Sequence, residues 1–266
     1  MSAPRPLLEV RGLGKRFEKR GARTEPLWAI RDLSFAVGER EFLTIVGPSG
    51  SGKSTLLNLV AQIDAPTEGE IRFGDQVIAR PGSGPLQPGW QRQFGYVTQD
   101  DTLLPWRTLS ENVLFPLRVQ GTLSPETRAR AAALMQAVGL QGFERHYPHE
   151  LSGGMRKRAA LVRTLVYDPP VILMDEPFGA LDAQTRTQLQ GDLLRLWNLG
   201  RKTIVFVTHD IGEAIALGDR VLVFTRAPAR VQSEHPIAIA RPRDVGNALL
   251  LEGFPETYER IRKELQ

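Results

Sequence analysis

A glycine-rich segment, residues 47–55, has the residue types and spacing that suit the binding of a phosphate group. It fits the pattern G-x-x-x-x-G-K-[ST], and its sequence is Gly47-Pro48-Ser49-Gly50-Ser51-Gly52-Lys53-Ser54-Thr55. Small residues let backbone N–H groups surround a phosphate, while Lys53 can reach the β and γ phosphates of a nucleotide and Ser54 can hold Mg²⁺. A Gly/Ser-rich turn can also match by chance, so a nucleotide site needs support from further motifs.

Polar residues follow three more predicted strands and could complete such a site. They are Gln99 after residues 93–98, Asp175-Glu176 after residues 171–174 and His209 at the end of the strand over residues 203–207. Ligands of open parallel sheets lie beyond the carboxyl ends of the strands, so we expect these side chains beside residues 47–55. Asp175 is then a Mg²⁺ ligand near Ser54, and Glu176 could polarise the attacking water. His209 could hydrogen-bond the γ-phosphate, and Gln99 could orient the water or the metal. Each alone is more simply a helix cap, a solvated turn or a surface residue, but together they predict nucleotide hydrolysis.

Two other candidates rest on weaker patterns. Phe17 is expected in the loop between the first two strands, where its ring could stack on adenine or could instead cap the core of a hairpin. His146 and His149 have i, i+3 spacing, but Pro148 lies between them and the sequence offers no further ligand. They therefore do not predict a metal site.

The elements that must position these residues alternate between strands and helices. Residues 7–13 and 28–37 predict one antiparallel hairpin, and Gly74-Asp75 joins a second over residues 70–79. Further strands are predicted at 42–46, 93–98, 171–174, 203–207 and 221–224, with helices near 56–62, 183–199 and 213–215. From Leu109 to about Leu165 only helical signals occur, including one helix that opens at Ser124-Pro125-Glu126. This order predicts an α/β fold with a mostly parallel sheet and a helical insertion.

Composition and charge exclude several classes of protein. The chain has 266 residues, of which 41% are hydrophobic and 24% charged, as in ordinary globular proteins. It has no apolar run near the roughly 18 residues of a membrane span, no signal-peptide core at its N-terminus and no cysteine. We therefore expect a cytoplasmic protein without membrane spans, disulfides or thiolate metal sites. The net charge of +4 is spread among nearly as many acids and is interpreted as a solvated surface.

Together, these motifs resemble those of an ATP-binding cassette ATPase, from about residue 7 to residue 260. The family's signature is matched by Leu151-Ser152-Gly153-Gly154-Met155, in company with residues 47–55, Gln99, residues 171–177, Ala180-Leu181-Asp182 and His209. Segments that resemble the nitrate, sulfonate and taurine importer branch are Leu103-Leu104-Pro105-Trp106, residues 151–155, 175–182 and 207–210, and Arg241-Pro242-Arg243. The chain departs from the family pattern at Arg156-Lys157-Arg158, around Arg163 and at Gln62. No catalytic group is lost, but the extra positive charge beside the signature could alter nucleotide or partner affinity.

The resemblance implies a RecA-like P-loop NTPase core, an N-terminal antiparallel β subdomain and an α-helical subdomain inserted at about residues 100–165. The ATPase domain would cover residues 1–240, and a C-terminal tail with a short helix would cover residues 241–266. The implied cofactors are ATP and Mg²⁺. Residues 47–55, Phe17 and Asp182 would bind the nucleotide, and Ser54, Gln99 and Asp175 the metal. The implied catalytic residues are Lys53, Gln99, Glu176 and His209.

The resemblance also implies partners. Two cassettes of this family sandwich two ATP molecules, so Ser152, Gly153 and Gly154 would complete the site of a second ATPase subunit, expected to be an identical copy. Opening and closing of this dimer would drive separate transmembrane permease subunits, which receive substrate from a periplasmic or extracellular binding protein. The chain would then lie at the cytoplasmic face of the cell membrane, and no nucleic acid partner is expected.

Rival functions remain weaker. A cassette ATPase acting on DNA would carry a coiled coil in the insertion, one acting on ribosomes would carry two cassettes, and a regulator without hydrolysis would lack Glu176 or His209. The transported substrate, whether nitrate, a sulfonate, taurine or another small organic anion, is not encoded in any motif of this chain.

Residues 100–106 contain three large apolar side chains, those of Leu103, Leu104 and Trp106, between Gln99 and the helical insertion. A cluster of apolar residues in a loop predicts a docking surface, here for a short permease helix with Trp106 near its centre. The alternative is that Leu104 and Trp106 pack the insertion onto the core.

Overall fold

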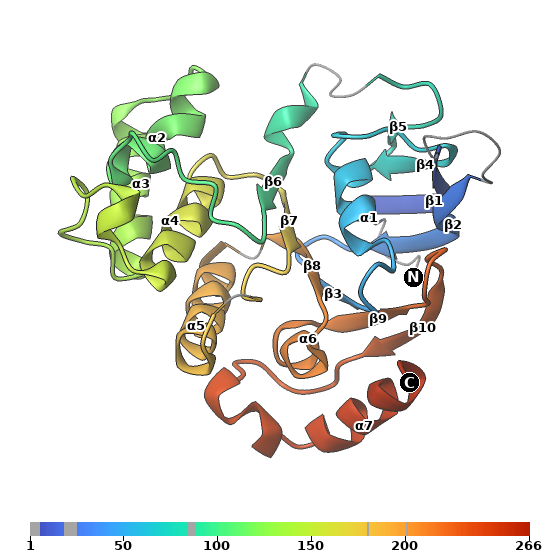
Figure 1. The fold of residues 1–266 in the computed structure, drawn as a ribbon. Coiled ribbons are helices and arrows are strands. Elements are labelled where there is room, and N and C mark those ends of the chain that lie inside the picture. Colours follow the sequence, from blue (N-terminus) through green and yellow to red (C-terminus); the bar gives the residue numbers. More distant parts are fainter. Residues whose placement is uncertain (1–5, 19–25, 85–88, 180, 201) are drawn as a thin grey trace. The chain divides into compact units, whose positions relative to one another are not determined.

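The computed structural model describes residues 6–18, 26–84, 89–179, 181–200 and 202–266 (Figure 1). They belong to two compact units, residues 1–91 with 202–266 and residues 92–201. Most of the N-terminal segment 1–6, part of the expected loop 80–89 and Ala180 lie outside the described residues. No described helix is long and apolar enough to cross a membrane. The expected domain bounds, 1–240 and 241–266, stay a prediction.

The first unit begins with a four-stranded antiparallel sheet in the order β2-β1-β4-β5. Its strands are β1 (Leu8–Phe17), β2 (Leu27–Val37), β4 (Glu68–Phe73) and β5 (Gln76–Ala79). Both predicted hairpins are confirmed. The expectation that Phe17 lies in a loop is wrong, because β1 ends at Phe17, which pairs with Leu27 of β2. The apolar alternation that predicts this strand stops earlier, since the pairing with β2 shifts register beyond Val10.

Parallel strands of the first unit carry the phosphate-binding segment. β3 (Phe42–Val46) pairs in parallel with β8 (Thr203–Thr208) and β9 (Arg220–Phe224), and β10 (Val231–Pro236) pairs antiparallel to β9. Every residue of β3 and β8 is buried, which explains their continuous apolar sequence. The register pairs Val46 with Thr208, so the residues that follow β3 and β8 emerge at the same edge. Two helices follow these strands, α1 (Lys53–Val60) and α6 (Ile211–Leu217).

The C-terminal end of the chain covers α6. It contains η3 (Val245–Leu250) and α7 (Phe254–Glu264), drawn in red beside α6 in Figure 1. Phe254 and Ile261 of α7 are buried in the same apolar cluster as Ala214 and Ile215 of α6 and Val46 of β3. The predicted tail with a short helix therefore packs on the core of the first unit.

The second unit contains the parallel pair β6 (Phe94–Val97) and β7 (Val171–Asp175). The short helix η1 (Trp90–Arg92) ends at Arg92, the first residue of this unit. Its helices are α2 (Leu109–Val119), α3 (Pro125–Ala137), η2 (Pro148–Glu150), α4 (Gly153–Leu165) and α5 (Ala183–Gly200). Thr108 and Ser124 begin α2 and α3 with capping boxes, in which each hydroxyl accepts from a backbone N–H three residues later. The predicted helical insertion is confirmed, since residues 109–165 are all described and contain no strand.

Candidate nucleotide site

The loop between β3 and α1 has a backbone shape that depends on two of its glycines. Gly50 and Gly52 have φ values of 75° and 94°, in the left-handed region that favours glycine. A Cβ built on Gly52 would lie 2.7 Å from the carbonyl oxygen of Ala29, so this position has no room for a side chain. The Lys53 ammonium is buried and donates to the carbonyl oxygens of Gly47 at 2.8 Å and Pro48 at 2.9 Å.

The chemistry of this loop fits an anionic ligand. Gly52 is the N-cap of α1, no side chain caps that end of the helix, and its first turn contains no acidic residue. The partial positive charge of a helix N-terminus is therefore not offset there by a carboxylate of α1. Ser54, the next residue along α1 after the buried Lys53, is exposed. A nucleotide phosphate fits this donor set, and the Ser54 hydroxyl is an oxygen ligand of the kind that Mg²⁺ prefers.

His209 follows β8 at the edge where the loop follows β3. Thr208 is buried and its hydroxyl accepts from the backbone N–H of Asp210 at 3.0 Å, whereas the His209 side chain is exposed. The Asp210 carboxylate accepts from the backbone N–H of Glu213 at 3.0 Å and so caps α6. The first unit therefore brings His209 and residues 47–55 to one edge of the same strands.

Phe17 lies at the end of β1 with 42% of its surface exposed. The Lys15 ammonium lies 5.1 Å from the centre of the Phe17 ring and pairs with the Asp64 carboxylate at 2.6 Å. A ring this exposed does not fill the core of the hairpin, and it remains accessible to a flat ligand such as a nucleobase.

In the second unit, the side chains of Gln99 and Glu176 both lie close to Gly179. A Cβ built on Gly179 would lie 3.7 Å from Oε2 of Glu176 and 3.8 Å from Nε2 of Gln99. Glu176 has a φ of 44°, an uncommon backbone conformation for a residue other than glycine and one that is often associated with functional sites. Asp175 ends β7 directly before it, and burial together with the negative charge of Asp175 raises the pKa of Tyr96. Sequence reasoning did not identify Tyr96, because its strand position is typical of a core residue.

The predicted signature begins α4. Ser152 is the N-cap and its hydroxyl accepts from the backbone N–H of Met155 at 3.2 Å. Gly153 and Gly154 form the first turn, and a Cβ on Gly154 would lie 2.9 Å from the Thr185 side chain of α5. The Asp182 carboxylate accepts from the backbone N–H of Thr185 at 2.9 Å, and this hydrogen bond is the largest cause of the lowered pKa of Asp182. Asp182 thus caps α5 in the structure.

Basic side chains of α4 hold the segment that follows Gln99. Arg156 pairs with the Asp101 carboxylate at 3.0 Å, and Lys157 donates to the carbonyl oxygen of Gln99. Arg163 donates to the carbonyl oxygens of Thr102 at 2.8 Å and Asp101 at 3.0 Å. Burial lowers the pKa of Lys157, against the opposing effects of Asp101 and Asp100. The extra positive charge beside the signature is therefore directed at this loop of its own unit.

The loop of residues 100–106 leaves Trp106 exposed. Trp106 is 70% exposed, whereas Leu103 is buried and Leu104 is half-buried. Asn112, which sequence reasoning missed, is fully buried; it accepts from the backbone N–H of Leu104 at 2.7 Å and donates to the carbonyl oxygens of Leu104 and Arg107. The exposure of Trp106 favours the docking surface over the alternative in which Leu104 and Trp106 pack the insertion onto the core.

Comparison with known proteins identifies the family. The family model of the ABC transporter matches residues 30–179. The chain is 39% identical to the aliphatic sulfonates import ATP-binding protein SsuB of Bacillus licheniformis and 38% identical to the taurine import ATP-binding protein TauB of Pseudomonas aeruginosa. Each similarity covers 97% of this chain and 94% of the relative.

A solved structure shows the same fold. It is the dimeric, post-hydrolysis state of the ATP-binding cassette MJ0796 bound to ADP and Pi, with a TM-score of 0.73 and 34% identity, covering 86% of this chain and 98% of the other. The expected P-loop NTPase fold, with its antiparallel β portion and its helical portion, is thereby confirmed. The chain belongs to the ABC transporter family and is an ATPase that uses ATP with Mg²⁺.

Proposed function

We propose that the chain powers the import of a small organic anion, of the sulfonate or taurine class, through separate permease subunits. The observation that carries this proposal is the similarity, over nearly the whole chain, to ATP-binding proteins named for the import of aliphatic sulfonates and of taurine. A binding protein outside the membrane would deliver the substrate to the permease, and this chain would lie against the cytoplasmic face. A cassette acting on nucleic acid or ribosomes is not favoured, because the two relatives described above are ATP-binding proteins of import systems.

The active assembly in this proposal is a pair of identical chains that share two ATP molecules. The dimeric form of the similar MJ0796 cassette supports the pairing. Ser152 is exposed at the N-terminus of α4, followed by two glycines, and this helix end suits a phosphate of ATP held by the other copy. Asp182, which caps α5, would lie at the same shared site. Each chain would then supply the phosphate loop of one site and the signature of the other.

Within one site, each proposed role follows from the chemistry of the side chain. Ser54, Asp175 and Gln99 are the oxygen donors that would hold Mg²⁺, which when bound would supply positive charge to offset that of the ATP phosphates. Lys53 would exchange its loop carbonyls for phosphate oxygens, and His209 would donate a hydrogen bond to the γ-phosphate. Glu176 would accept the proton of the attacking water, which Gln99 helps to orient. The exposed ring of Phe17 would stack on adenine.

The loop of residues 100–106 would receive a short helix of the permease. Its exposed Trp106 is the type of aromatic residue that dominates the energetics of interfaces. Asn112 fixes the backbone of Leu104 and Arg107 on either side of it. Because Arg156, Lys157 and Arg163 connect this loop to α4, a change at the nucleotide would be transmitted to the permease contact by a chain of direct bonds.

Two variants test the assignment of the site. Glu176→Gln keeps the size and hydrogen-bonding ability of the side chain but removes its basicity, so we expect ATP affinity near that of the parent with hydrolysis slower by roughly 100-fold or more. Lys53→Ala should instead weaken ATP binding. ATP affinity measured by calorimetry and phosphate release measured with the assembled transporter distinguish these effects. Parent-level hydrolysis by Glu176→Gln would show that Glu176 is not the base.

The transport assignment needs a separate assay. Vesicles that contain the chain with its permease and binding protein should take up a labelled sulfonate or taurine only when ATP is supplied on the side of this chain. ATP hydrolysis that responds to DNA or ribosomes, and not to the permease, would favour the rival function.

A further inference from the structure

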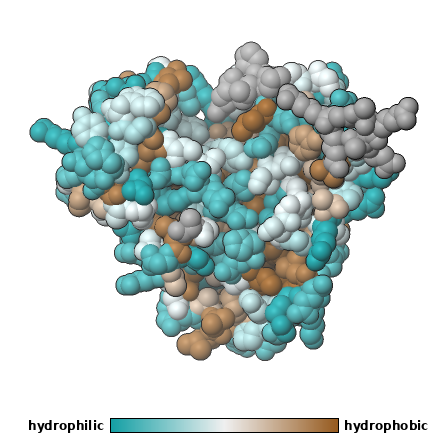
Figure 2. All heavy atoms as spheres, viewed as in Figure 1, coloured by the Kyte–Doolittle hydropathy of each residue, from teal (hydrophilic) through white to brown (hydrophobic). Residues whose placement is uncertain are grey.

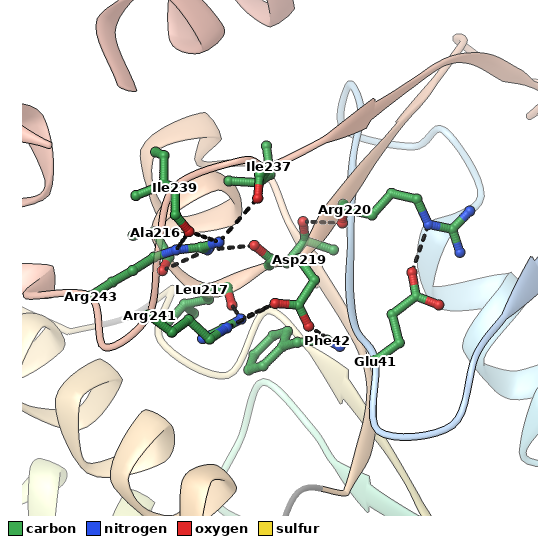
Figure 3. A network of polar contacts seen from close by, with 12 residues as sticks. Glu41, Phe42, Ala216, Leu217, Asp219, Arg220, Ile237, Ile239, Arg241 and Arg243 are labelled. Atoms are coloured by element: carbon green, nitrogen blue, oxygen red, sulfur yellow. Dashed lines mark hydrogen bonds and ion pairs between the residues drawn. The ribbon is translucent and has the colours of Figure 1, made fainter. Parts of the chain in front are cut away.

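Arg243 is a buried arginine that the nucleotide site does not explain. Its side chain is 6% exposed, and burial is the largest cause that lowers its pKa to about 10, followed by the nearby charge of Arg241. It still carries its positive charge at neutral pH. Its hydrogen bonds in the described chain all end on main-chain carbonyl oxygens (Figure 3). Burying a charge is costly unless it is well bonded, so this arrangement calls for a specific role.

The carbonyls that Arg243 binds belong to the end of α6 and to residues 237–243, here named the strap. Nη1 of Arg243 donates to Ile215 at 3.0 Å, to Ala216 at 3.4 Å and to Gly218. Nε and Nη2 donate to Ile239 of the strap at 3.0 and 2.9 Å. One guanidinium therefore joins the strap to the last turn of α6.

Arg241 completes this arrangement. Its Nη2 donates to the carbonyl oxygen of Leu217 at 2.6 Å, and its Nε donates to the Asp219 carboxylate at 2.8 Å. The other oxygen of Asp219 accepts from the backbone N–H of Phe42, the first residue of β3, at 2.9 Å. Figure 3 shows Arg241 and Arg243 approaching the end of α6 side by side from the strap.

These bonds satisfy the end of a helix that has little stability of its own. The last four carbonyls of a helix lack partners within it, and α6 has seven residues, fewer than an isolated helix needs. The carbonyl of Ala214 accepts from the backbone N–H of Gly218, at 2.9 Å, and from the Thr44 hydroxyl, at 3.1 Å. The next three accept from Arg243 and Arg241, whose positive charges also suit the negative end of a helix.

The other end of α6 carries His209. Asp210 is the N-cap of α6 and His209 directly precedes it, after the buried Thr208 of β8. Any shift of α6 along or about its axis therefore moves the turn that presents His209. The strap and α6 share the apolar cluster that contains Ile237 and Ala214, so the two arginines fix the depth and rotation of the helix in that cluster.

We infer that Arg243, assisted by Arg241, is a positioning residue for His209, because it holds the C-terminal end of α6 and thereby sets the turn at the other end of the helix. This inference rests on the proposed role of His209 in hydrolysis. The segment Arg241-Pro242-Arg243 thereby acts on the nucleotide site from a distance. Its two guanidinium groups bind the C-terminal end of α6, and His209 lies next to the N-terminal end of the same helix.

A double-mutant cycle in the full-length chain tests the inference. The variants are Arg243→Met, the charge-retaining Arg243→Lys, His209→Ala and the two combinations with His209→Ala, with release of labelled phosphate from ATP as the readout. We expect Arg243→Met to lower kcat by roughly 10- to 100-fold, the size of effect that misplacement by about 1 Å produces, with KM for ATP little changed. Arg243→Lys should recover part of the loss. In the His209→Ala background, replacement of Arg243 should change kcat by less than about twofold, because the group it positions is absent.

Arg262→Met is the matched control. Arg262 also belongs to the C-terminal segment, but its side chain is 46% exposed and, among the described residues, its ion pair is with the nearby Glu259, so its replacement should leave kcat unchanged. Equal losses from the Arg243 variants in both backgrounds would show a general structural effect and overturn the inference. A normal kcat in Arg243→Met, alongside a reduced one in His209→Ala, would overturn it as well. Full hydrolysis by His209→Ala would instead refute the proposed role of His209 itself. If Arg243→Met does not fold, the cycle with Arg243→Lys decides.

Discussion

The buried ion pair between Arg158 of α4 and Asp192 of α5 predicts how much stability the chain loses when one of the two charges is removed. The Asp192 carboxylate of α5 accepts from Nε of Arg158 at 2.9 Å and from Nη2 of Arg195 at 2.8 Å. The Asp192 side chain is 5% exposed and that of Arg158 is 15% exposed, whereas that of Arg195 is 62% exposed. The change to be made is Asp192→Asn, which preserves shape and removes only the negative charge.

Breaking a buried pair by removing one partner typically costs 3–5 kcal/mol, because the other charge stays buried without its partner. The asparagine oxygen still accepts one hydrogen bond, so we take the lower end, about 3 kcal/mol. Loss of the exposed Arg195 contact adds little. For a chain of this size, 1 kcal/mol corresponds to roughly 2–4 °C, so Tm should fall by roughly 6–12 °C.

The assay is thermal unfolding followed by circular dichroism, with urea unfolding as a second measure of the free energy. Glu259→Gln is the control, because it removes a carboxylate of the same charge from an exposed pair on α7 and should lower Tm by no more than about 2–4 °C. The double variant Arg158→Met with Asp192→Leu should regain most of the stability, since neither charge is then buried. If Asp192→Asn has the same Tm as the Glu259→Gln control, the claim that this ion pair holds α4 to α5 is refuted.

The remaining predictions concern partners. Because each site needs the signature of a second copy, ATPase activity should rise more steeply than linearly with protein concentration. Ser152→Arg should abolish that rise. It should lower the free energy of unfolding by only about 1 kcal/mol, through loss of the N-cap of α4. Constant specific activity down to the dilute monomer would contradict shared sites. Trp106→Ala should weaken permease binding by about 2 kcal/mol, roughly 30-fold in Kd, and leave the Tm of the chain nearly unchanged, because Trp106 is 70% exposed. A pull-down that retains the permease with a lowered Tm would show that Trp106 has a packing role instead.

The elements that sequence reasoning predicted well are those with strong local patterns. The buried strands β3, β7 and β8 are continuous apolar runs, and α3 opens at Ser124-Pro125 with a cap that the structure confirms. The polar strand β10 was missed, because its sequence, Val231–Pro236, contains serine, glutamate and histidine and lies at the edge beside β9. The end of β1 at Phe17 was missed because register shifts interrupt the alternation that marks a strand.

In the candidate site, too, the features with a strong local sequence pattern could be predicted and the others could not. Motif spacing alone predicted residues 47–55 and their backbone shape, since only glycine fits at Gly52. The bonds from Lys157 to the Gln99 carbonyl and from Asn112 to Leu104 could not be predicted. A side chain that binds a distant main-chain group has no partner residue type to search for, so the sequence contains no paired signal for it.

The difference between binding a side chain and binding the main chain affects how two arginine contacts can change during evolution. The contacts are that of Arg158 with Asp192 and that of Arg243 with the carbonyl oxygens of α6. The bond between Arg158 and Asp192 needs a matching charge at both positions, so substitutions there are expected to occur in pairs. Arg243 binds carbonyl oxygens, which every residue possesses, so the bonds themselves require no particular side chain at residues 215 and 216. Analyses of correlated substitutions would therefore detect the contact between Arg158 and Asp192 and overlook those of Arg243. Arg243 nevertheless makes more hydrogen bonds than Arg158 does to Asp192.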